Sequence, residues 1–386
     1  MLSARAASKP LVLLPVATPG PMAQVAAGGP TGLLGVGIDG GLFALPLARG
    51  AAQRMADNID AGTPLASGHG RIAARRRDGA LWVLEAGRAG ISVERTLAPA
   101  AGLLVLPLAV IAIAREGLRH QAIRLEPAGS GAWRSVAQSV ANALPDARPL
   151  QADLDGSGDG GHVVMLAGPD SERYTHGVLG DAVEATRVVL LERHSLKVMR
   201  ELVVDAPQVF EDIAPRKVAL ASRDGLLTVR SGPRGAQLVL VDADPESAAA
   251  LRVAASGPAL GQANRWLSPI TDGQRWMAVH TPHLGGVLHE YRRDGSRLVP
   301  RELLPGVSNH RIGSRQLDVS AWQGQRLLIP DATGRHVWLL DIASAGRIVA
   351  EYALPSRVAA MVGLGAAGGG ALLLDDGSVA LASPLA

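Results

Sequence analysis

The amino-acid sequence predicts an all-β fold, a β-propeller in which a chain of 386 residues forms a ring of small sheets. Short apolar runs alternate with glycine turns, a motif led by arginine recurs at a fixed spacing, and helical periodicity is nearly absent. The 47% of hydrophobic residues can supply a core, and Gly 46 and Pro 25 punctuate many short elements rather than long helices. We expect residues 28–386 to form a single propeller domain.

Asp-Gly pairs between apolar runs predict β-hairpins, because both residues suit a tight turn between two strands. Four such pairs occur: Asp39-Gly40, Asp78-Gly79, Asp224-Gly225 and Asp376-Gly377. The uncharged stretch Leu97–Ala114 is divided by Pro99, Gly102 and Pro107. It therefore predicts consecutive buried strands rather than a membrane span.

The arginine motif sets the repeat. An arginine followed by apolar residues precedes the presumed first strand of each repeat, and Arg265, Arg311 and Arg357 are each 46 residues apart. Weaker copies bring the number of starts to eight, but the last start leaves only about thirty residues, too few for four strands. We expect the N- and C-terminal segments to pair and close the ring, which favours seven blades over eight. The longest interval predicts an extended loop or extra hairpin at residues 168–205.

The N-terminal segment 1–27 has the features of a signal peptide. Arg5 and Lys9 are positive, Leu11–Val16 is apolar, and Val25–Ala27 offers small residues for cleavage. This predicts a periplasmic or secreted protein, and a cytoplasmic one if the segment is not a signal peptide. The absence of cysteine excludes disulfides and thiolate sites without deciding the compartment.

The charge pattern excludes one class of partner. The formal net charge is +3, and nearly all positive charge is arginine interspersed with acids. Nucleic-acid binders concentrate basic residues on one face, often beside aromatic side chains, and aromatics are only 3% here. We expect a monomer that binds no nucleic acid and is not an integral membrane protein.

An acidic loop is the most specific chemical motif. It places oxygen ligands at alternate positions between glycines, a spacing that lets a loop curl around calcium. The candidate ligands of a single calcium site are Asp153, Asp155, Ser157 and Asp159. The distal glutamate of an EF-hand is missing, and the alternative is a polar turn that binds nothing.

This loop resembles the calcium loops of FG-GAP or VCBS repeats, which occur in bacterial and integrin α-subunit propellers. Several further segments resemble a group of exported, functionally uncharacterised bacterial propellers with VCBS repeats: residues 173–181, 209–216, 264–270, 280–286 and 308–313. The resemblance covers about residues 148–320 and implies a calcium-stabilised propeller outside the cytoplasm. The acids expected in further loops are missing at residues 219–225 and 270–273, so it implies no more than one metal site.

The same segments carry polar residues just before the presumed innermost strands. Equivalent positions of successive repeats lie around a ring, so these side chains are expected to converge at one mouth of the central channel, where arginine suits an anionic ligand. The candidate ligand-binding residues are His176, Asp181, Glu211, Asp212, Arg216, Arg265, His283, Asn309, His310 and Arg311. The alternative is that they join neighbouring blades by pairing buried polar groups.

No nucleophile elbow or phosphate loop occurs, so we assign no catalytic residue. The sequence predicts a binding or scaffolding module whose partner is a protein, a glycan or a small anion. The alternative is an enzyme that acts on an anionic substrate with histidine, arginine and acidic residues at the channel mouth. That alternative requires His176, Asp212, Arg265 and His310 to open onto one concave surface.

Overall fold

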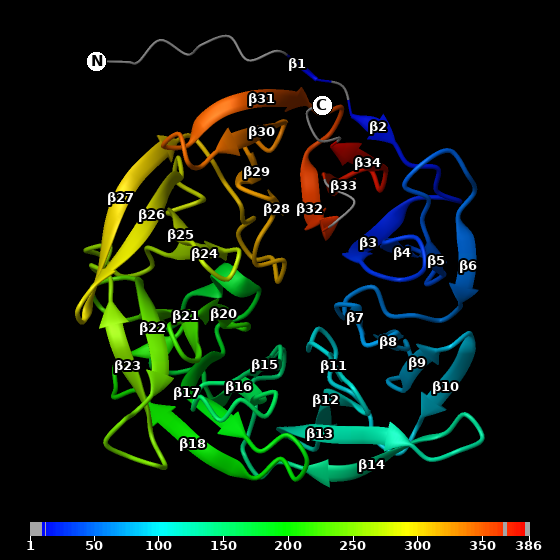
Figure 1. Cartoon of the computed structure of the whole chain (residues 1–386), viewed down its shortest axis with the longest axis horizontal. Helices are drawn as coiled ribbons and strands as arrows, with labels where there is room; N and C mark the ends of the chain where they lie inside the picture. Colours follow the sequence, from blue (N-terminus) through cyan, green and yellow to red (C-terminus); the bar gives the residue numbers. More distant parts are fainter. Residues whose placement is uncertain (1–9, 12, 366–368, 383–386) are drawn as a thin grey trace.

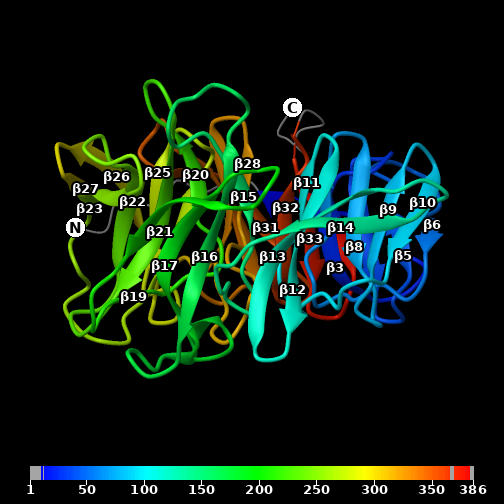
Figure 2. The same ribbon diagram turned by 90° about the horizontal axis from the view of Figure 1, so that it is seen from below.

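The computed structural model describes residues 10–11, 13–365 and 369–382, and its regular secondary structure is almost entirely β-strands arranged around a central axis (Figures 1 and 2). Neighbouring strands of each unit pair antiparallel, and the described strands form eight units of four strands each, apart from β1 (Pro10–Leu11) and β19 (Val209–Phe210). We call these units blades and number them along the chain. The all-β propeller prediction is confirmed, while the favoured count of seven is one fewer than these pairings give.

Blades one to four follow the chain from the N-terminal side. Blades one and two contain β3 (Met22–Ala27), β4 (Leu33–Gly37), β5 (Leu42–Ala44), β6 (Gln53–Ala56), and β7 (Ala66–Gly68), β8 (Arg71–Arg75), β9 (Leu81–Glu85), β10 (Arg88–Ser92). Blades three and four contain β11 (Leu104–Leu106), β12 (Ala109–Glu116), β13 (Arg119–Pro127), β14 (Trp133–Gln138), and β15 (Leu150–Ala152), β16 (His162–Asp170), β17 (Glu184–Leu191), β18 (Val198–Val203). A short 3₁₀ helix, Gly177–Leu179, lies between β16 and β17.

Blades five to eight complete the ring. Blades five and six contain β20 (Arg216–Ala219), β21 (Asp224–Ser231), β22 (Gln237–Ala243), β23 (Leu251–Ser256), and β24 (Leu267–Thr271), β25 (Trp276–His280), β26 (Val287–Asp294), β27 (Arg297–Pro305). Blades seven and eight contain β28 (Ala321–Gln323), β29 (Arg326–Pro330), β30 (His336–Asp341), β31 (Arg347–Ala353), and β32 (Val358–Gly363), β33 (Gly370–Leu374), β34 (Val379–Ala382), β2 (Leu14–Pro15).

Blade eight combines strands from both ends of the chain. Its fourth strand, β2, pairs antiparallel with β34, so that Leu14 lies opposite Leu381. A second N-terminal strand, β1 (Pro10–Leu11), adds to β31 of blade seven in parallel. In Figure 1, β1 lies outside β31 and β2 lies beside β34.

Strand β3 occupies part of the expected signal peptide. It spans Met22–Ala27 and pairs with β4, while residues 1–9 and 12 lie outside the described residues. A cut after Ala27 would therefore remove one strand of blade one and the fourth strand of blade eight.

The long interval between blades four and five contains an additional short strand. Strand β19 (Val209–Phe210) pairs with both β17 and β21 and so joins the two blades in one sheet. It begins just after the interval 168–205, in which we expected an extended loop or a hairpin. The interval itself holds the end of β16, the 3₁₀ helix and strands β17 and β18.

Three of the four Asp-Gly hairpins are formed as expected. At these turns only the glycine has a positive φ, for example 87° at Gly40, and the aspartate accepts the N–H two residues later, as Asp39 does from Gly41 at 2.9 Å. The fourth pair is a correction, because Asp224 and Gly225 lie inside β21. The turn between β20 and β21 lies just before this pair, at residues 220–223, where Leu220 N donates to the carbonyl oxygen of Arg223 at 2.8 Å.

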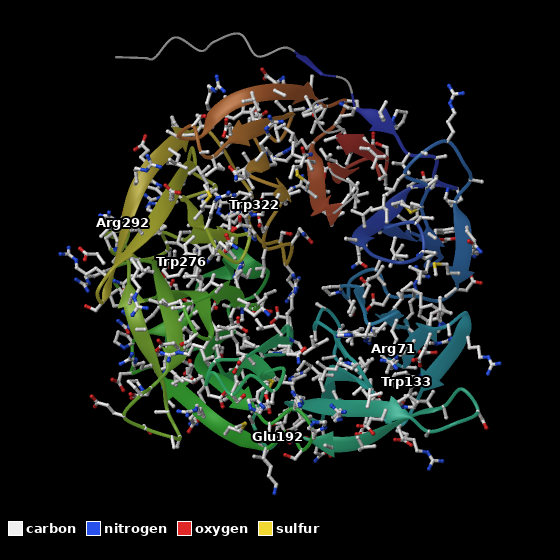
Figure 3. All side chains as sticks on the ribbon, in the orientation of Figure 1. Arg71, Trp133, Glu192, Trp276, Arg292 and Trp322 are labelled. Atoms are coloured by element: carbon white, nitrogen blue, oxygen red, sulfur yellow. The ribbon has the colours of Figure 1, made fainter. Side chains whose placement is uncertain are left out.

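The core is aliphatic, and side chains fill the space within and between the blades (Figure 3). Residues Leu97–Ala114 contribute β11 and the buried start of β12, which confirms the expected strands. Within the described ranges, no helix is long and apolar enough to cross a membrane.

Candidate functional site

The loop between blades six and seven lies close to the ring axis. We call residues 308–319 the axial segment (Figure 1). Its Gly313 N–H donates to the carbonyl oxygen of Val178 at 2.8 Å, and its Leu317 carbonyl accepts from Ser268 Oγ at 2.9 Å. One loop is thus attached both to the insertion of blade four and to blade six.

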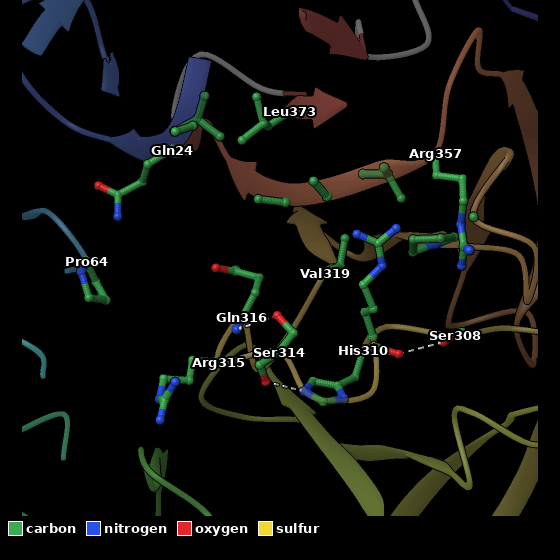
Figure 4. A pocket seen from close by; sticks show the side chains of 18 of the residues that line it. Gln24, Pro64, Ser308, His310, Ser314, Arg315, Gln316, Val319, Arg357 and Leu373 are labelled. Carbon is green, nitrogen blue, oxygen red and sulfur yellow. Dashed lines mark hydrogen bonds between the residues drawn. The ribbon is translucent and has the colours of Figure 1, made fainter. Parts of the chain in front are cut away.

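A cavity of about 310 Å³ lies beside the axial segment (Figure 4). Gln24 and Pro64 of blades one and two face the segment across this axial cavity, and Arg357 and Leu373 come from the side of blade eight. Its other polar lining residues are Arg148, Ser308, His310, Arg311, Ser314, Arg315, Gln316 and Asp331.

Two of the four arginines that line the axial cavity are neutralised by carboxylates. Arg311 donates two hydrogen bonds to Asp375, at 3.2 and 2.7 Å. Arg315 donates Nε to Asp146 at 2.8 Å and Nη2 to Asp181 at 2.5 Å. Burial raises the pKa of Asp146, and the Arg315 guanidinium opposes that rise.

The other two arginines have no carboxylate partner among the described residues. Arg148 donates Nη2 to the carbonyl oxygen of Arg315, and its buried Nε has no hydrogen-bond partner in the described part of the chain. Burial lowers the pKa of Arg148 to about 10, so it stays charged at neutral pH. Arg357 is exposed, and no ion pair or side-chain hydrogen bond joins it to any other described residue. The one carboxylate in the lining, Asp331, accepts from Thr333 Oγ1 at 2.8 Å.

Two histidines form a chain at the base of the axial segment. His310 Nε2 lies 2.9 Å from the carbonyl oxygen of Ser314, and its Nδ1 lies 3.0 Å from Nε2 of His283. A carbonyl only accepts, so His310 donates from Nε2 and accepts from His283 on Nδ1. Trp266 stacks against His283 with the rings 5° from parallel. Burial lowers the pKa of each histidine to about 4, so both are neutral at pH 7.

Glu211 connects blades four, five and six. It is completely buried, and its carboxylate contacts Nδ1 of His176 and accepts a short hydrogen bond from Ser231 Oγ. Its carbonyl oxygen accepts from Trp266 Nε1 at 3.1 Å. Burial raises the pKa of Glu211, and the hydrogen bond from His176 opposes that rise. Burial and the Glu211 charge raise the pKa of neighbouring Glu184 to about 10, so its carboxyl is uncharged at pH 7.

Asp212 and Asn309 are structural connections rather than surface groups. Asp212 has no exposed surface and accepts from Arg216 Nη1 at 2.5 Å and Thr228 Oγ1 at 3.0 Å. Asn309 is also fully buried and donates Nδ2 to Ser268 Oγ at 2.9 Å. The Asp212 contacts lie within blade five, whereas the Asn309 contact joins the axial segment to blade six.

The predicted ligand-binding residues are therefore divided among several places. His310 and Arg311 line the axial cavity, whereas Arg265 lines a separate recess with His280 and His289. Because Asp212 is fully buried, the four residues required by the enzyme alternative do not open onto one surface.

The sequence interpretation missed three arginines of the axial cavity. Arg148 and Arg357 match the repeat motif and were interpreted only as markers of strand starts, and Arg315 lies four residues beyond the marker Arg311. The repeat motif thus includes two of these three arginines that line the axial cavity.

The aspartate carboxylates of the acidic loop accept hydrogen bonds from other groups of the same loop. The two carboxylate oxygens of Asp153 accept from the N–H groups of Ser157 and Gly158, both at 3.0 Å. Asp155 Oδ1 accepts from the same Ser157 N–H at 3.3 Å. Asp159 Oδ1 accepts from the Ser157 hydroxyl at 2.9 Å. Four carboxylate oxygens of the three aspartates therefore accept hydrogen bonds from within the loop.

A guanidinium lies against the same loop. Arg193 Nη1 donates to the carbonyl oxygens of Asp159 and Gly161 and lies 3.7 Å from Asp159 Oδ1. Among the residues that the structure describes, no group of three or more His, Cys, Asp or Glu side chains is placed to hold a metal ion. The loop in this arrangement does not fit a calcium site.

Comparison with known proteins supports the fold. No protein-family model and no curated protein sequence matches this chain. BamB from Moraxella catarrhalis is similar in structure at 14% identity, with 98% of both chains covered and a TM-score of 0.59. Sqt1 from Saccharomyces cerevisiae has 10% identity and a TM-score of 0.62, with 97% of this chain and 98% of that chain covered.

The β-propeller domain of Myceliophteria thermophila Cps50 (Swd1) is similar at 11% identity and a TM-score of 0.50, with 84% of this chain and 96% of that domain covered. At identities this low, the similarity shows the fold alone and says nothing about activity. No family model supports the resemblance to FG-GAP and VCBS repeats. The protein is a β-propeller.

Proposed function

We propose that this chain is a binding or scaffolding module whose ligand-binding face is the end of the ring that carries the axial segment. The axial cavity is the observation that carries the proposal, because loops and strands of several blades meet there around arginine and amide groups. Concave sites with a few convergent polar groups are the usual ligand sites of such folds. Other candidate residues make structural contacts, which favours binding over catalysis: Glu211 joins His176 of blade four to blade five, and Asp212 pairs with Arg216 within blade five.

We further propose that the protein is a monomer outside the cytoplasm, in the periplasm or secreted, with a protein, a glycan or a small anion as its partner. The composition of residues 1–27 and the resemblance to exported VCBS-repeat propellers support this location. Since β2 pairs with β34, we place any leader cleavage before Leu14 rather than after Ala27. Mass spectrometry of the exported protein would locate its first residue.

Calcium is a separate hypothesis that rests on the resemblance alone. The hydrogen bonds of the acidic loop argue against it, and the binding proposal does not depend on it.

A capture experiment tests the proposed function. The immobilised protein is exposed to solubilised cell-envelope material, and a captured component is identified and tested again in purified form. Gln316→Trp fills the axial cavity, and Arg292→Trp on the outer edge of the ring is the control (Figures 3 and 4). We expect Gln316→Trp to abolish capture and Arg292→Trp to retain it. Equal capture by all three proteins, or no capture by the unmodified protein, would contradict the proposal.

A further inference from the structure

The axial cavity holds positive charge that the protein does not neutralise. Arg148, which precedes blade four, and Arg357, which precedes blade eight, both line it, and no described carboxylate lies within ion-pair distance of either. Arg311 and Arg315, by contrast, are each held by aspartates.

The charged side chain of Arg148, whose Nε is buried, is energetically unfavourable without a counter-ion. A buried N–H group without a partner loses its hydration and gains no hydrogen bond in return. The Nε of Arg148 is such a group. An anion in the cavity would place a negative charge near the Arg148 guanidinium, whereas Arg315 already pairs with Asp146 and Asp181.

The remaining polar groups of the cavity carry little negative charge. Asp331 is the one carboxylate among the described lining residues, and its Oδ1 accepts from the N–H groups of Arg335 and His336, both at 3.1 Å. His310 is neutral, and its two nitrogens are used by His283 and Ser314. Little in the wall therefore repels a negative charge.

We propose that the axial cavity binds an oxyanion group of the ligand, a phosphate, sulfate or carboxylate, with Arg357 as the contacting residue and Arg148 as the unpaired positive charge of the wall. Guanidinium is suited to this role because its planar fork donates two parallel hydrogen bonds to an oxyanion. Arg357 is free to turn toward a ligand because it is exposed and unpaired among the described residues. This inference rests on the proposed binding function and specifies the chemistry of the ligand.

The test is a calorimetric titration with inorganic phosphate, sulfate or malonate at constant ionic strength, with chloride as the reference anion. We expect at least one of the three to bind and to raise the melting temperature more than chloride does. Binding of phosphate or sulfate alone identifies a tetrahedral oxyanion, and binding of malonate alone identifies a carboxylate.

Variants of exposed arginines make the test specific. Arg357→Gln is expected to weaken the binding about ten-fold or more, and Arg357→Lys is expected to weaken it less, because it keeps the charge and loses the fork. Arg292→Gln, on the outer edge of the ring, should leave it unchanged (Figure 3). No binding beyond that of chloride, or equal binding by Arg357→Gln and the unmodified protein, would overturn the inference. If capture of a partner through the axial cavity succeeds while no anion binds, the proposed function stands and the oxyanion inference fails.

Discussion

Asp212 shows what the polar residues near the axis do for stability. Its buried carboxylate accepts from Arg216, from Thr228 and from the N–H groups of Ile213 and Ala214. Removing one partner of such a buried pair leaves the other charge without compensation, and this costs more than the intact pair contributes.

We expect Asp212→Ala to lower the free energy of unfolding by about 3 kcal/mol, because Arg216 would remain mostly buried without its partner. Urea unfolding followed by circular dichroism measures this loss. Asp57→Ala is the control, since Asp57 pairs with Arg54 at an exposed site and should cost less than about 1 kcal/mol. Equal losses for the two variants would contradict the structural role of Asp212.

The histidine chain predicts a pH dependence of stability. The pKa values of His283 and His310 are about 4 in the folded protein, below the ordinary 6.5, because burial disfavours the charged imidazole. The unfolded chain therefore binds more protons than the folded one between about pH 4 and 6.5. The stabilisation is fully present above pH 6.5 and is lost as the pH falls toward 4.

Urea unfolding across this pH range tests the prediction. Each neutral histidine contributes up to about 1.4 kcal/mol per pH unit to the slope. His283→Gln should make the decline shallower, whereas His194→Gln, at an exposed position, should leave the slope unchanged. An unchanged slope in His283→Gln would show that His283 does not titrate in this way.

Individual site residues could be predicted only in part. The polar segments were recognisable, and they do place His310 and Arg311 at the axial cavity. The burial of Asp212 and the position of Arg265 in a separate recess could not be predicted, because both depend on how far each strand lies from the axis.

At the level of elements, the acidic loop makes a measurable prediction about calcium. Its carboxylates accept N–H and O–H groups, and Arg193 supplies the positive charge beside its carbonyls. We expect neither chelator nor added calcium to change the melting temperature by more than about 1 °C, since a ligand stabilises only the state that binds it. A calcium-dependent rise of several degrees, removed by Asp153→Asn, would restore the calcium hypothesis.

Hairpins were predictable because their signal is local. Asp39 and Asp376 each lie next to a glycine and stabilise the turn within a few residues. Asp224 has the same neighbour, yet it accepts from the N–H of Asp153 in blade four at 2.8 Å, and this distant contact accompanies its place in a strand. The axial segment was unpredictable for the same reason, because Arg315 binds Asp146 in a loop before blade four.

The whole ring makes a prediction about its N-terminus. A chain that begins at residue 28 lacks β2 and β3 and leaves the edges of β34 and β4 unpaired. We expect it to aggregate or to melt at least about 10 °C lower, because unpaired edges and uncovered apolar side chains are exposed together. A chain that begins at residue 13 keeps both strands and should melt within about 3 °C of the full chain by differential scanning calorimetry. Equal melting temperatures for the two shortened chains would show that β3 contributes little.

The repeat could be predicted at this scale, but the number of blades was uncertain. The arginine motif gave eight starts, and the short last repeat favoured a count of seven. In the structure the last blade takes its fourth strand from the N-terminal side, so eight starts correspond to eight blades. Sequence spacing alone does not show which strand an N-terminal segment will join.

Because Leu14 pairs with Leu381, blade eight cannot form until the C-terminal end of the chain has been synthesised. At a translation rate of about 5–20 residues per second, roughly 20–70 s pass between the synthesis of these two residues. During that time β2 has no strand to pair with, and the apolar face of blade one lacks its neighbour. A newly made chain therefore needs protection from association with other copies until its last blade has emerged from the ribosome.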